Sequence, residues 1–255
     1  MSGKDIRLKR LFPTPDHSLF SVPLDHSLTM GPIAGLETLP PLARRLQEGG
    51  VTALIVHKGA VKSLQPVLQP HTLLGIHLSA STTLAEDPSW KYRAGTAGEA
   101  VRLGADFVSV QVNFGVPGEG EMLRDLGTVA EETAALGLPL LCMAYVKKKG
   151  KEYDPEAVAH ACRAAADLGA DIVKTSFTGA ESFRKVVSSV HVPVLVGGGQ
   201  KLSSKEDLLH LVSDSLKAGA RGICIGRNLF QDADVTGLCG EVASILRGGA
   251  GTRSD

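Results

Sequence analysis

Lys174 is the residue of this chain whose position points most directly to chemistry. It stands in Ala-Asp-Ile-Val-Lys-Thr-Ser-Phe (residues 170–177), at the predicted end of a short apolar strand. A buried ammonium is costly unless its charge is paired or its proton is lost, and a desolvated lysine has a lowered pKa. The neutral amine is a nucleophile toward carbonyl carbon. The position indicates imine chemistry; the alternative is a lysine that extends out of the strand end and stays charged.

Two other residues are suited to move the protons that imine chemistry requires. An acid must remove the carbinolamine hydroxyl as water, and making or breaking a carbon–carbon bond needs a proton carrier at the aldol hydroxyl. Tyr145 and Asp25 each follow a short apolar run and are groups of this kind. The alternatives are a core tyrosine with a satisfied hydroxyl and a carboxylate that caps the next loop.

Two glycine-containing segments follow the last two apolar runs and could hold an anion. Residues 197–199 are Gly-Gly-Gly, and Gly226 precedes Arg227. Glycine lets backbone N–H groups approach an anion closely, and the arginine adds a fixed positive charge. We therefore predict a phosphate site made by Gly198, Gly199, Gly226 and Arg227. The alternative is that these glycines only form turns.

Weaker candidates stand at other strand ends. His26, Lys58 and Ser79 are possible substrate ligands by position, and Lys58 competes with Lys174 as the imine-forming lysine. Lys58 precedes a glycine and is expected to leave the strand, so it ranks second. His26, His57 and His77 fall on separate strands without the spacing of a known metal motif, so we predict neither a catalytic metal nor a cofactor.

The elements that must position these residues alternate regularly. Eight apolar runs are typical of parallel strands that are covered on both faces: residues 19–24, 53–57, 73–78, 107–112, 138–144, 171–174, 192–196 and 222–225. Helical periodicity and capping signals favour helices between most of them: residues 36–48, 98–103, 119–136, 155–168 and 203–218.

Eight βα units with short links predict an α/β protein, a single-domain (β/α)₈ TIM barrel over residues 19–247. The alternative is an open, doubly wound sheet. In a barrel the active site lies at the carboxyl ends of the strands, and the loops after strands seven and eight commonly bind phosphate. Residues 1–18 are interpreted as an N-terminal arm, and residues 248–255 as a disordered tail.

The composition excludes several classes of protein. The 255 residues include 27 Lys plus Arg and 27 Asp plus Glu, so the chain lacks the basic excess that nucleic-acid or anionic membrane surfaces require. Aromatic residues make up only 4%, which leaves no stacking platform for bases. No apolar stretch is long enough to span a bilayer, no signal-peptide core opens the chain, and the four cysteines show no paired spacing. We expect a reduced, cytoplasmic protein without nucleic-acid or membrane partners.

Taken in order, several short motifs cover most of the chain from residue 19 to 231. They are Val-Pro-Leu-Asp-His-Ser (22–27), His-Lys-Gly (57–59), Ile-His-Leu-Ser-Ala-Ser-Thr (76–82), Leu-Cys-Met-Ala-Tyr (141–145), residues 170–177, Gly-Gly-Gly (197–199) and Gly-Arg-Asn-Leu-Phe-Gln (226–231). This series resembles the archaeal-type class I aldolase family, which includes fructose-bisphosphate aldolase and 2-amino-3,7-dideoxy-D-threo-hept-6-ulosonate synthase. The resemblance implies Lys174 as the Schiff-base lysine, Tyr145 as proton donor, Asp25 as a second acid/base, and phosphate at the glycine loops.

Within that family the chain is most similar to the actinobacterial branch that makes 3-amino-4-hydroxybenzoate precursors. The resemblance implies condensation of dihydroxyacetone phosphate with an aldehyde, L-aspartate 4-semialdehyde. One departure is residues 146–150, Val-Lys-Lys-Lys-Gly, where the family usually has Pro-Arg-Gly. This loop is expected to face the acceptor, whose carboxylate could be bound by Lys58, Arg93 or a lysine of residues 147–149.

Three other readings stay open on the sequence. The chain could cleave fructose bisphosphate, act as a hept-6-ulosonate synthase with a phosphosugar donor, or be a phosphosugar isomerase or binding barrel without an imine. Family members are often homo-oligomers, and the apolar segment 235–246 offers a surface for a second copy.

Overall fold

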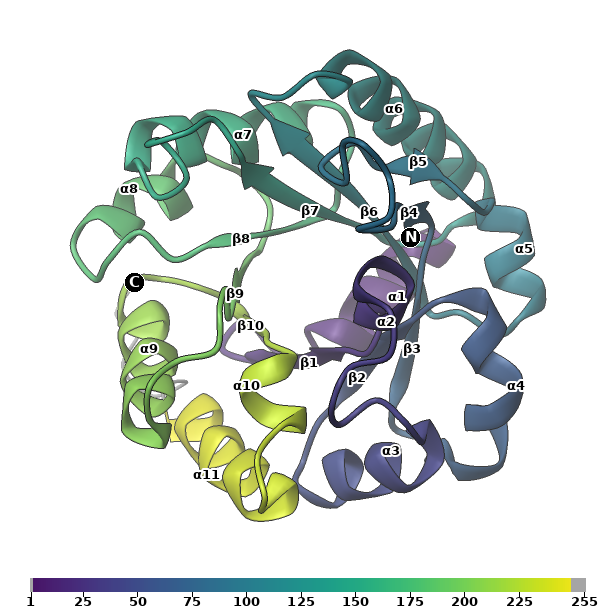
Figure 1. The fold of residues 1–255 in the computed structure, drawn as a ribbon, viewed down its shortest axis with the longest axis vertical. Coiled ribbons are helices and arrows are strands. Elements are labelled where there is room, and N and C mark those ends of the chain that lie inside the picture. The colour runs from purple at the N-terminus through teal and green to yellow at the C-terminus, as the bar shows by residue number, and fades with distance from the viewer. Residues whose placement is uncertain (1, 249–255) are drawn as a thin grey trace.

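The structure, a computed structural model that describes residues 2–248, is a closed barrel of eight parallel strands (Figure 1). Around the barrel the order is β1, β10, β9, β8, β7, β6, β3 and β2, so consecutive βα units lie side by side. All eight predicted strands are confirmed, and the doubly wound alternative is wrong. The barrel strands are β1 (Leu19–Pro23), β2 (Ala53–Val56), β3 (Leu73–His77), β6 (Phe107–Phe114), β7 (Leu140–Val146), β8 (Ile172–Ser176), β9 (Val194–Gly197) and β10 (Gly222–Cys224).

Helices form a ring outside the barrel (Figure 1). The five predicted helices are confirmed within a few residues at each end: α3 (Leu39–Glu48), α5 (Ala97–Arg102), α6 (Glu119–Leu136), α7 (Pro155–Asp167) and α9 (Lys205–Lys217). Asp154 and Ser204 start two of them as side-chain caps, because their oxygens accept bonds from the backbone N–H groups of Ala157 and Asp207 at 3.1 Å each. The remaining elements are α2 (His26–Met30), η1 (Lys58–Ala60), α4 (Val61–Leu64), η2 (Gln65–Val67), α8 (Ser182–Ser188), α10 (Arg227–Phe230) and α11 (Val235–Gly248).

The segment before the first strand is more than an arm. It contains the helix α1 (Gly3–Leu11), which begins with a capping box between Ser2 and Asp5. Leu11 is fully buried in the apolar cluster that fills the barrel interior, together with Leu19 and Phe107. This helix therefore closes the amino-terminal end of the barrel and is part of the domain.

A short hairpin over the opposite end was not predicted. Its strands, β4 (Ser79–Ala80) and β5 (Tyr92–Arg93), pair antiparallel, with Ser79 opposite Arg93. The Asn113 side chain of β6 donates a 2.6 Å hydrogen bond to the Ser89 carbonyl and so attaches the hairpin loop to the barrel. The strands are only two residues long, too short for an alternating pattern to reveal them.

The carboxyl-terminal end differs slightly from expectation. Helix α11 continues to Gly248, the first residue of the predicted tail, and the rest of that tail lies outside the described residues. Within residues 2–248 no helix is both long enough and apolar enough to cross a membrane.

Candidate active site

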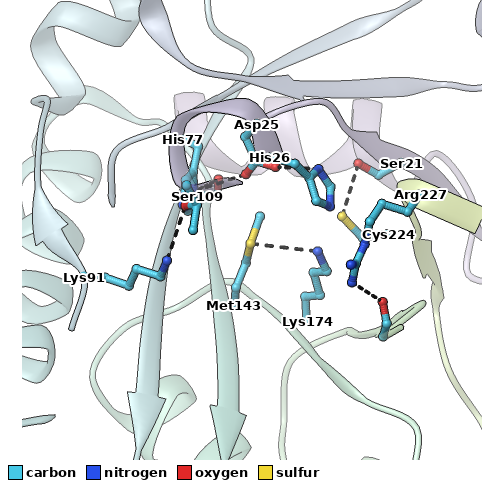
Figure 2. A network of polar contacts seen from close by, with 12 residues as sticks. Ser21, Asp25, His26, His77, Lys91, Ser109, Met143, Lys174, Cys224 and Arg227 are labelled. Carbon is cyan, nitrogen blue, oxygen red and sulfur yellow. Dashed lines mark hydrogen bonds and ion pairs between the residues drawn. The ribbon is translucent and has the colours of Figure 1, made fainter. Parts of the chain in front are cut away.

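A cavity of about 470 Å³ opens at the carboxyl ends of the barrel strands. Its walls bring together Lys174 from β8, Tyr145 from β7 and Asp25 from the end of β1. Figure 2 shows Lys174 and Asp25 among the polar side chains that meet there. The three residues predicted to carry chemistry, from segments far apart in the chain, thus share one site.

Lys174 lies in the middle of β8, not at its end as predicted. The strand continues to Ser176, because Thr175 and Ser176 also pair with β9. Only 6% of Lys174 is exposed, so the alternative of a lysine that extends into solvent is wrong. Its Nζ atom lies 3.9 Å from the Met143 Sδ atom and 5.9 Å from the centre of the Tyr145 ring. A rigid strand therefore holds the amine inside the barrel.

The charge state of Lys174 differs from the expectation drawn from burial alone. Burial lowers its pKa, but Cys224, Tyr145 and the Asp25 carboxylate raise it, and the net direction is upward from the ordinary value. This direction is opposite to the prediction of a lysine made neutral by desolvation, because polar neighbours compensate for the lost water. An ammonium is not a nucleophile, so Lys174 must give up a proton before it attacks a carbonyl.

Asp25 lies between two histidines and is placed for proton transfer rather than for capping. It precedes α2 but makes no side-chain cap bond to that helix. Its carboxylate lies 3.5 Å from His26 Nδ1 and 4.0 Å from His77 Nδ1. Burial would raise the pKa of Asp25, but His77, His26 and Lys174 outweigh it and hold the pKa below its usual value. Asp25 is therefore a carboxylate at neutral pH and can accept a proton.

Tyr145 complements Asp25 as a proton donor. Burial raises the pKa of its phenol, against the opposing effect of Lys174, so the hydroxyl stays protonated at neutral pH. Gly197, the last residue of β9, provides the space for this hydroxyl. A methyl group on Gly197 would lie 2.9 Å from Tyr145 Oη and 3.3 Å from Lys174 Cε. The first glycine of the triplet thus makes room for Tyr145 and Lys174, a role that the sequence analysis did not predict.

Gly197→Ala is expected to lower kcat by about 10²-fold, the usual effect of displacing a reacting group by about 1 Å. The backbone of Gly197 does not adopt a positive φ, so alanine fits the main chain and only the side-chain contact changes. Steady-state kinetics and thermal unfolding separate the two effects. Gly127→Ala is the control, because its added methyl group meets nothing within 4 Å. Equal activity of both variants would contradict the assigned role of Gly197.

The four predicted phosphate ligands also lie together. Gly198, Gly199, Gly226 and Arg227 all line the cavity, on the loops that follow β9 and β10. Arg227 Nη2 donates a 2.8 Å hydrogen bond to the Gly199 carbonyl, and the Asn228 side chain donates a 3.2 Å bond to the Gly198 carbonyl. These bonds join the two loops into one surface with a fixed positive charge, as a phosphate site requires.

The structure separates the weaker candidates. His26 and Ser79 line the cavity, and Ser79 Oγ accepts a 2.9 Å hydrogen bond from the backbone of Gln111. Lys58 does not line it: this lysine is half exposed and forms a 3.0 Å ion pair with Glu99. Lys58 is therefore badly placed to form an imine in this cavity.

Sequence reasoning missed a buried lysine in the same cavity, Lys91. It belongs to the hairpin loop, where no periodic pattern marks a site. Of the basic residues that were considered for the acceptor, Arg93 is paired with Glu132 and does not line the cavity. Lys147 does line it, with its Nζ 5.6 Å from the centre of the Tyr145 ring.

His77 gives the fold a specific sensitivity to acid. Burial lowers its pKa from the ordinary value to about 3, against the attraction of Asp25, and its Nδ1 lies 2.8 Å from Ser109 Oγ. Below about pH 6.5 the unfolded chain binds a proton that the folded protein excludes until about pH 3. The free energy of unfolding should therefore fall on acidification through this window, by at most about 1.4 kcal/mol per pH unit.

Urea unfolding between pH 4 and pH 8 would measure this effect. His77→Gln, which keeps an amide for Ser109, should show a shallower loss of stability on acidification than the unmodified protein. His71→Gln, at an exposed position, is the matched control. An identical pH dependence in all three proteins would contradict the assignment to His77.

Within residues 2–248 no group of three or more His, Cys, Asp or Glu side chains is arranged to hold a metal ion. Two histidines near Asp25, His57 and His77, pack ring edge against ring face, with their centroids 5.4 Å apart. The cavity brings together an amine, a phenol and a carboxylate, from Lys174, Tyr145 and Asp25.

Comparisons with known proteins agree with this arrangement. The model for the DeoC/LacD family aldolases matches residues 19–232. The 2-amino-4,5-dihydroxy-6-oxo-7-(phosphonooxy)heptanoate synthase of Streptomyces griseus is 39% identical over 254 residues, which cover 98% of this chain and 92% of that protein. The 2-amino-3,7-dideoxy-D-threo-hept-6-ulosonate synthase of Halobacterium salinarum is 35% identical over 247 residues, covering 96% and 92%.

Two solved structures are similar over nearly their whole length. The crystal structure of an archaeal fructose 1,6-bisphosphate aldolase matches with a TM-score of 0.86 at 29% identity, covering 96% of this chain and 99% of that one. A further archaeal fructose-1,6-bisphosphate aldolase, whose catalytic lysine is covalently bound to the carbinolamine intermediate of the substrate, matches with a TM-score of 0.85 at 27% identity, covering 95% and 99%.

Proposed function

The chain belongs to the DeoC/LacD family of aldolases, and we propose that it joins dihydroxyacetone phosphate to L-aspartate 4-semialdehyde through an imine on Lys174. Membership confirms the resemblance carried by the motifs and makes the protein a class I, Schiff-base aldolase. The observation that carries the specific proposal is the convergence of Lys174, Tyr145 and Asp25 beside the glycine loops in one cavity. The name of the Streptomyces griseus relative supports the pair of substrates.

The proposed reaction begins with the donor ketone. Its phosphate binds at Arg227 and the loop glycines, and its carbonyl carbon lies at Lys174. After Lys174 loses a proton, with Asp25 as the available acceptor, the amine adds to the carbonyl to give a carbinolamine. Tyr145 donates the proton with which the hydroxyl leaves as water, and the iminium forms.

Carbon–carbon bond formation follows from the iminium. The positive nitrogen makes the hydroxymethyl carbon acidic, so this carbon loses a proton to the Tyr145 phenolate, or to Asp25 once Asp25 has released the proton of Lys174 to water, and becomes the nucleophile of an enamine. The enamine attacks the aldehyde carbon of the acceptor, and the protonated partner returns its proton to the new alkoxide. Water then hydrolyses the iminium and regenerates Lys174. A three-carbon ketone and a four-carbon aldehyde thus give a seven-carbon amino-keto phosphate.

The test is a condensation assay that compares substrates. The unmodified protein is incubated with dihydroxyacetone phosphate and L-aspartate 4-semialdehyde, and the seven-carbon phosphate is followed by mass spectrometry. Cleavage of fructose 1,6-bisphosphate is measured in parallel. We expect product from the first pair at a kcat/KM well above that for the sugar bisphosphate. Preference for the sugar bisphosphate would replace the proposed synthase with a fructose-bisphosphate aldolase, and no borohydride-reducible adduct with either substrate would overturn the imine mechanism.

A further inference from the structure

Lys91 is a buried cation whose side-chain hydrogen-bond partners in the described structure are both uncharged. The residue is 8% exposed, and the Asp25 carboxylate acts on it from beyond the distance of an ion pair. The Lys91 Nζ contacts Ser81 Oγ at 2.5 Å and Thr29 Oγ1 at 3.4 Å. An ammonium has three donors, so one has no partner among these residues. A buried charge paired only with hydroxyls is costly, which favours a site that is completed by an anion.

The position of Lys91 is fixed by the hairpin and is not a chance orientation of a flexible chain. The Ser81 hydroxyl donates to the Pro88 carbonyl at 2.8 Å, so its remaining lone pairs face the lysine. Trp90, the preceding residue, stacks on Tyr92 with ring centroids 5.1 Å apart. Together with the bond from β6 to the hairpin loop described above, these contacts hold the ammonium in place before a ligand arrives. Such preorganisation reduces the entropic cost of binding.

The hairpin and the phosphate loops lie on opposite sides of the barrel. In the circular strand order, β3 is four strands from β9, and β6 is four strands from β10. The hairpin follows β3 with only Leu78 between them, and it is bonded to β6 by the hydrogen bond from Gln111 N to Ser79 Oγ. Figure 2 accordingly places Lys91 and Arg227 on opposite sides of Lys174. A molecule that spans the cavity would meet a cation at each end and the imine lysine between them.

From this geometry we infer that Lys91, held in place by Ser81 and joined by the Thr29 hydroxyl at the cavity wall, binds the carboxylate of the acceptor aldehyde and so selects anionic acceptors. The inference rests on the function proposed above and identifies the acceptor end of the same cavity. One ammonium with the Thr29 hydroxyl matches a carboxylate, which has a single charge and two oxygens, better than a phosphate dianion. Lys147, at the edge of the cavity, is more exposed and therefore more strongly screened.

Lys91→Met tests the inference, because methionine keeps the volume and removes the charge. With L-aspartate 4-semialdehyde, its KM should rise by about 10- to 100-fold, the usual effect of losing a hydrogen bond between charged groups. With propanal, which has no carboxylate, kcat/KM should change by less than about 3-fold. The borohydride-trapped adduct with dihydroxyacetone phosphate should form at the unmodified rate. Lys91→Arg should recover part of the preference for the anionic aldehyde.

The outcomes distinguish the two proposals. Lys62→Met, which removes an exposed lysine outside the cavity, is the charge-matched control. The role of Lys91 would be overturned if Lys91→Met lost activity equally with both aldehydes, or if it lost activity with neither of them. If the unmodified protein forms no adduct, the proposed function fails, and calorimetry with L-homoserine still tests Lys91. This alcohol analogue of the semialdehyde cannot react, and binding at least about 10-fold weaker to Lys91→Met is expected; equal or absent binding would overturn the inference.

Discussion

Lys174→Met is expected to abolish the adduct that borohydride traps with dihydroxyacetone phosphate, and to reduce turnover by about 10⁴-fold or more. The variant removes the nitrogen that forms the imine and keeps an apolar side chain in a site that is already 94% covered, since Lys174 is 6% exposed. Its Tm should fall, because the neighbours that raise the pKa of Lys174 stabilise its ammonium in the folded protein and Asp25 would lose this partner. Intact mass after reduction and steady-state kinetics provide the measurement.

Lys58→Met is the matched control for this experiment. Lys58 lies outside the cavity and pairs with Glu99, so its removal should leave both the adduct and turnover essentially unchanged. Surface ion pairs of this kind contribute at most about 1 kcal/mol to stability. An adduct that persists in Lys174→Met and disappears in Lys58→Met would exchange the two roles and contradict the geometry of the site.

Tyr145→Phe is expected to separate imine formation from proton transfer. The ring that packs near Lys174 remains, whereas the hydroxyl in the space left by Gly197 is lost. Turnover should fall by about 10²- to 10⁴-fold, the range for removing a positioned acid. Given enough time, the reduced adduct with dihydroxyacetone phosphate should still accumulate, because Lys174 is intact. Rapid-quench trapping compared with kcat measures the two steps.

Asp25→Asn offers the complementary change. The amide keeps the size of the carboxylate but can neither accept a proton nor raise the pKa of Lys174 by its charge. The rate of adduct formation in Asp25→Asn should therefore depend on pH differently from the rate in Tyr145→Phe.

If Tyr145→Phe kept turnover within about 3-fold of the unmodified protein, the phenol would be a packing residue and another residue would have to act as the acid.

The barrel could be predicted because its strands are short, apolar and covered on both faces, a pattern that is visible without tertiary information. Helix α1 could not be predicted from the sequence, because its amphipathic pattern is weak: of its nine residues Leu11 is the one that is buried. What makes it a helix is its capping box and its packing into the barrel end. The β4–β5 hairpin depends on pairing between residues 79–80 and 92–93 and on anchoring by Asn113, which are tertiary effects.

In the candidate site, too, some features could be predicted from the sequence and others depend on tertiary contacts. Lys174, Tyr145 and the glycine loops were predicted because strand ends in a barrel converge on one rim. The direction of the Lys174 pKa shift differs from the prediction, because it depends on Cys224, Tyr145 and Asp25. The sequence does not reveal how far these residues lie from the lysine in the fold. Lys91 was missed because a loop residue becomes a site residue only through the fold of its hairpin.

The position of helix α1 has a kinetic consequence. Leu11 and the apolar side chains around it fill the amino-terminal half of the barrel, so the described cavity communicates with solvent at its hairpin end. The donor, acceptor and product of the proposed reaction are therefore expected to share this opening. The ketone reacts at the deeper position, on Lys174, and therefore has to enter before the aldehyde covers it. We therefore expect the proposed condensation to be ordered, with the donor ketone binding first.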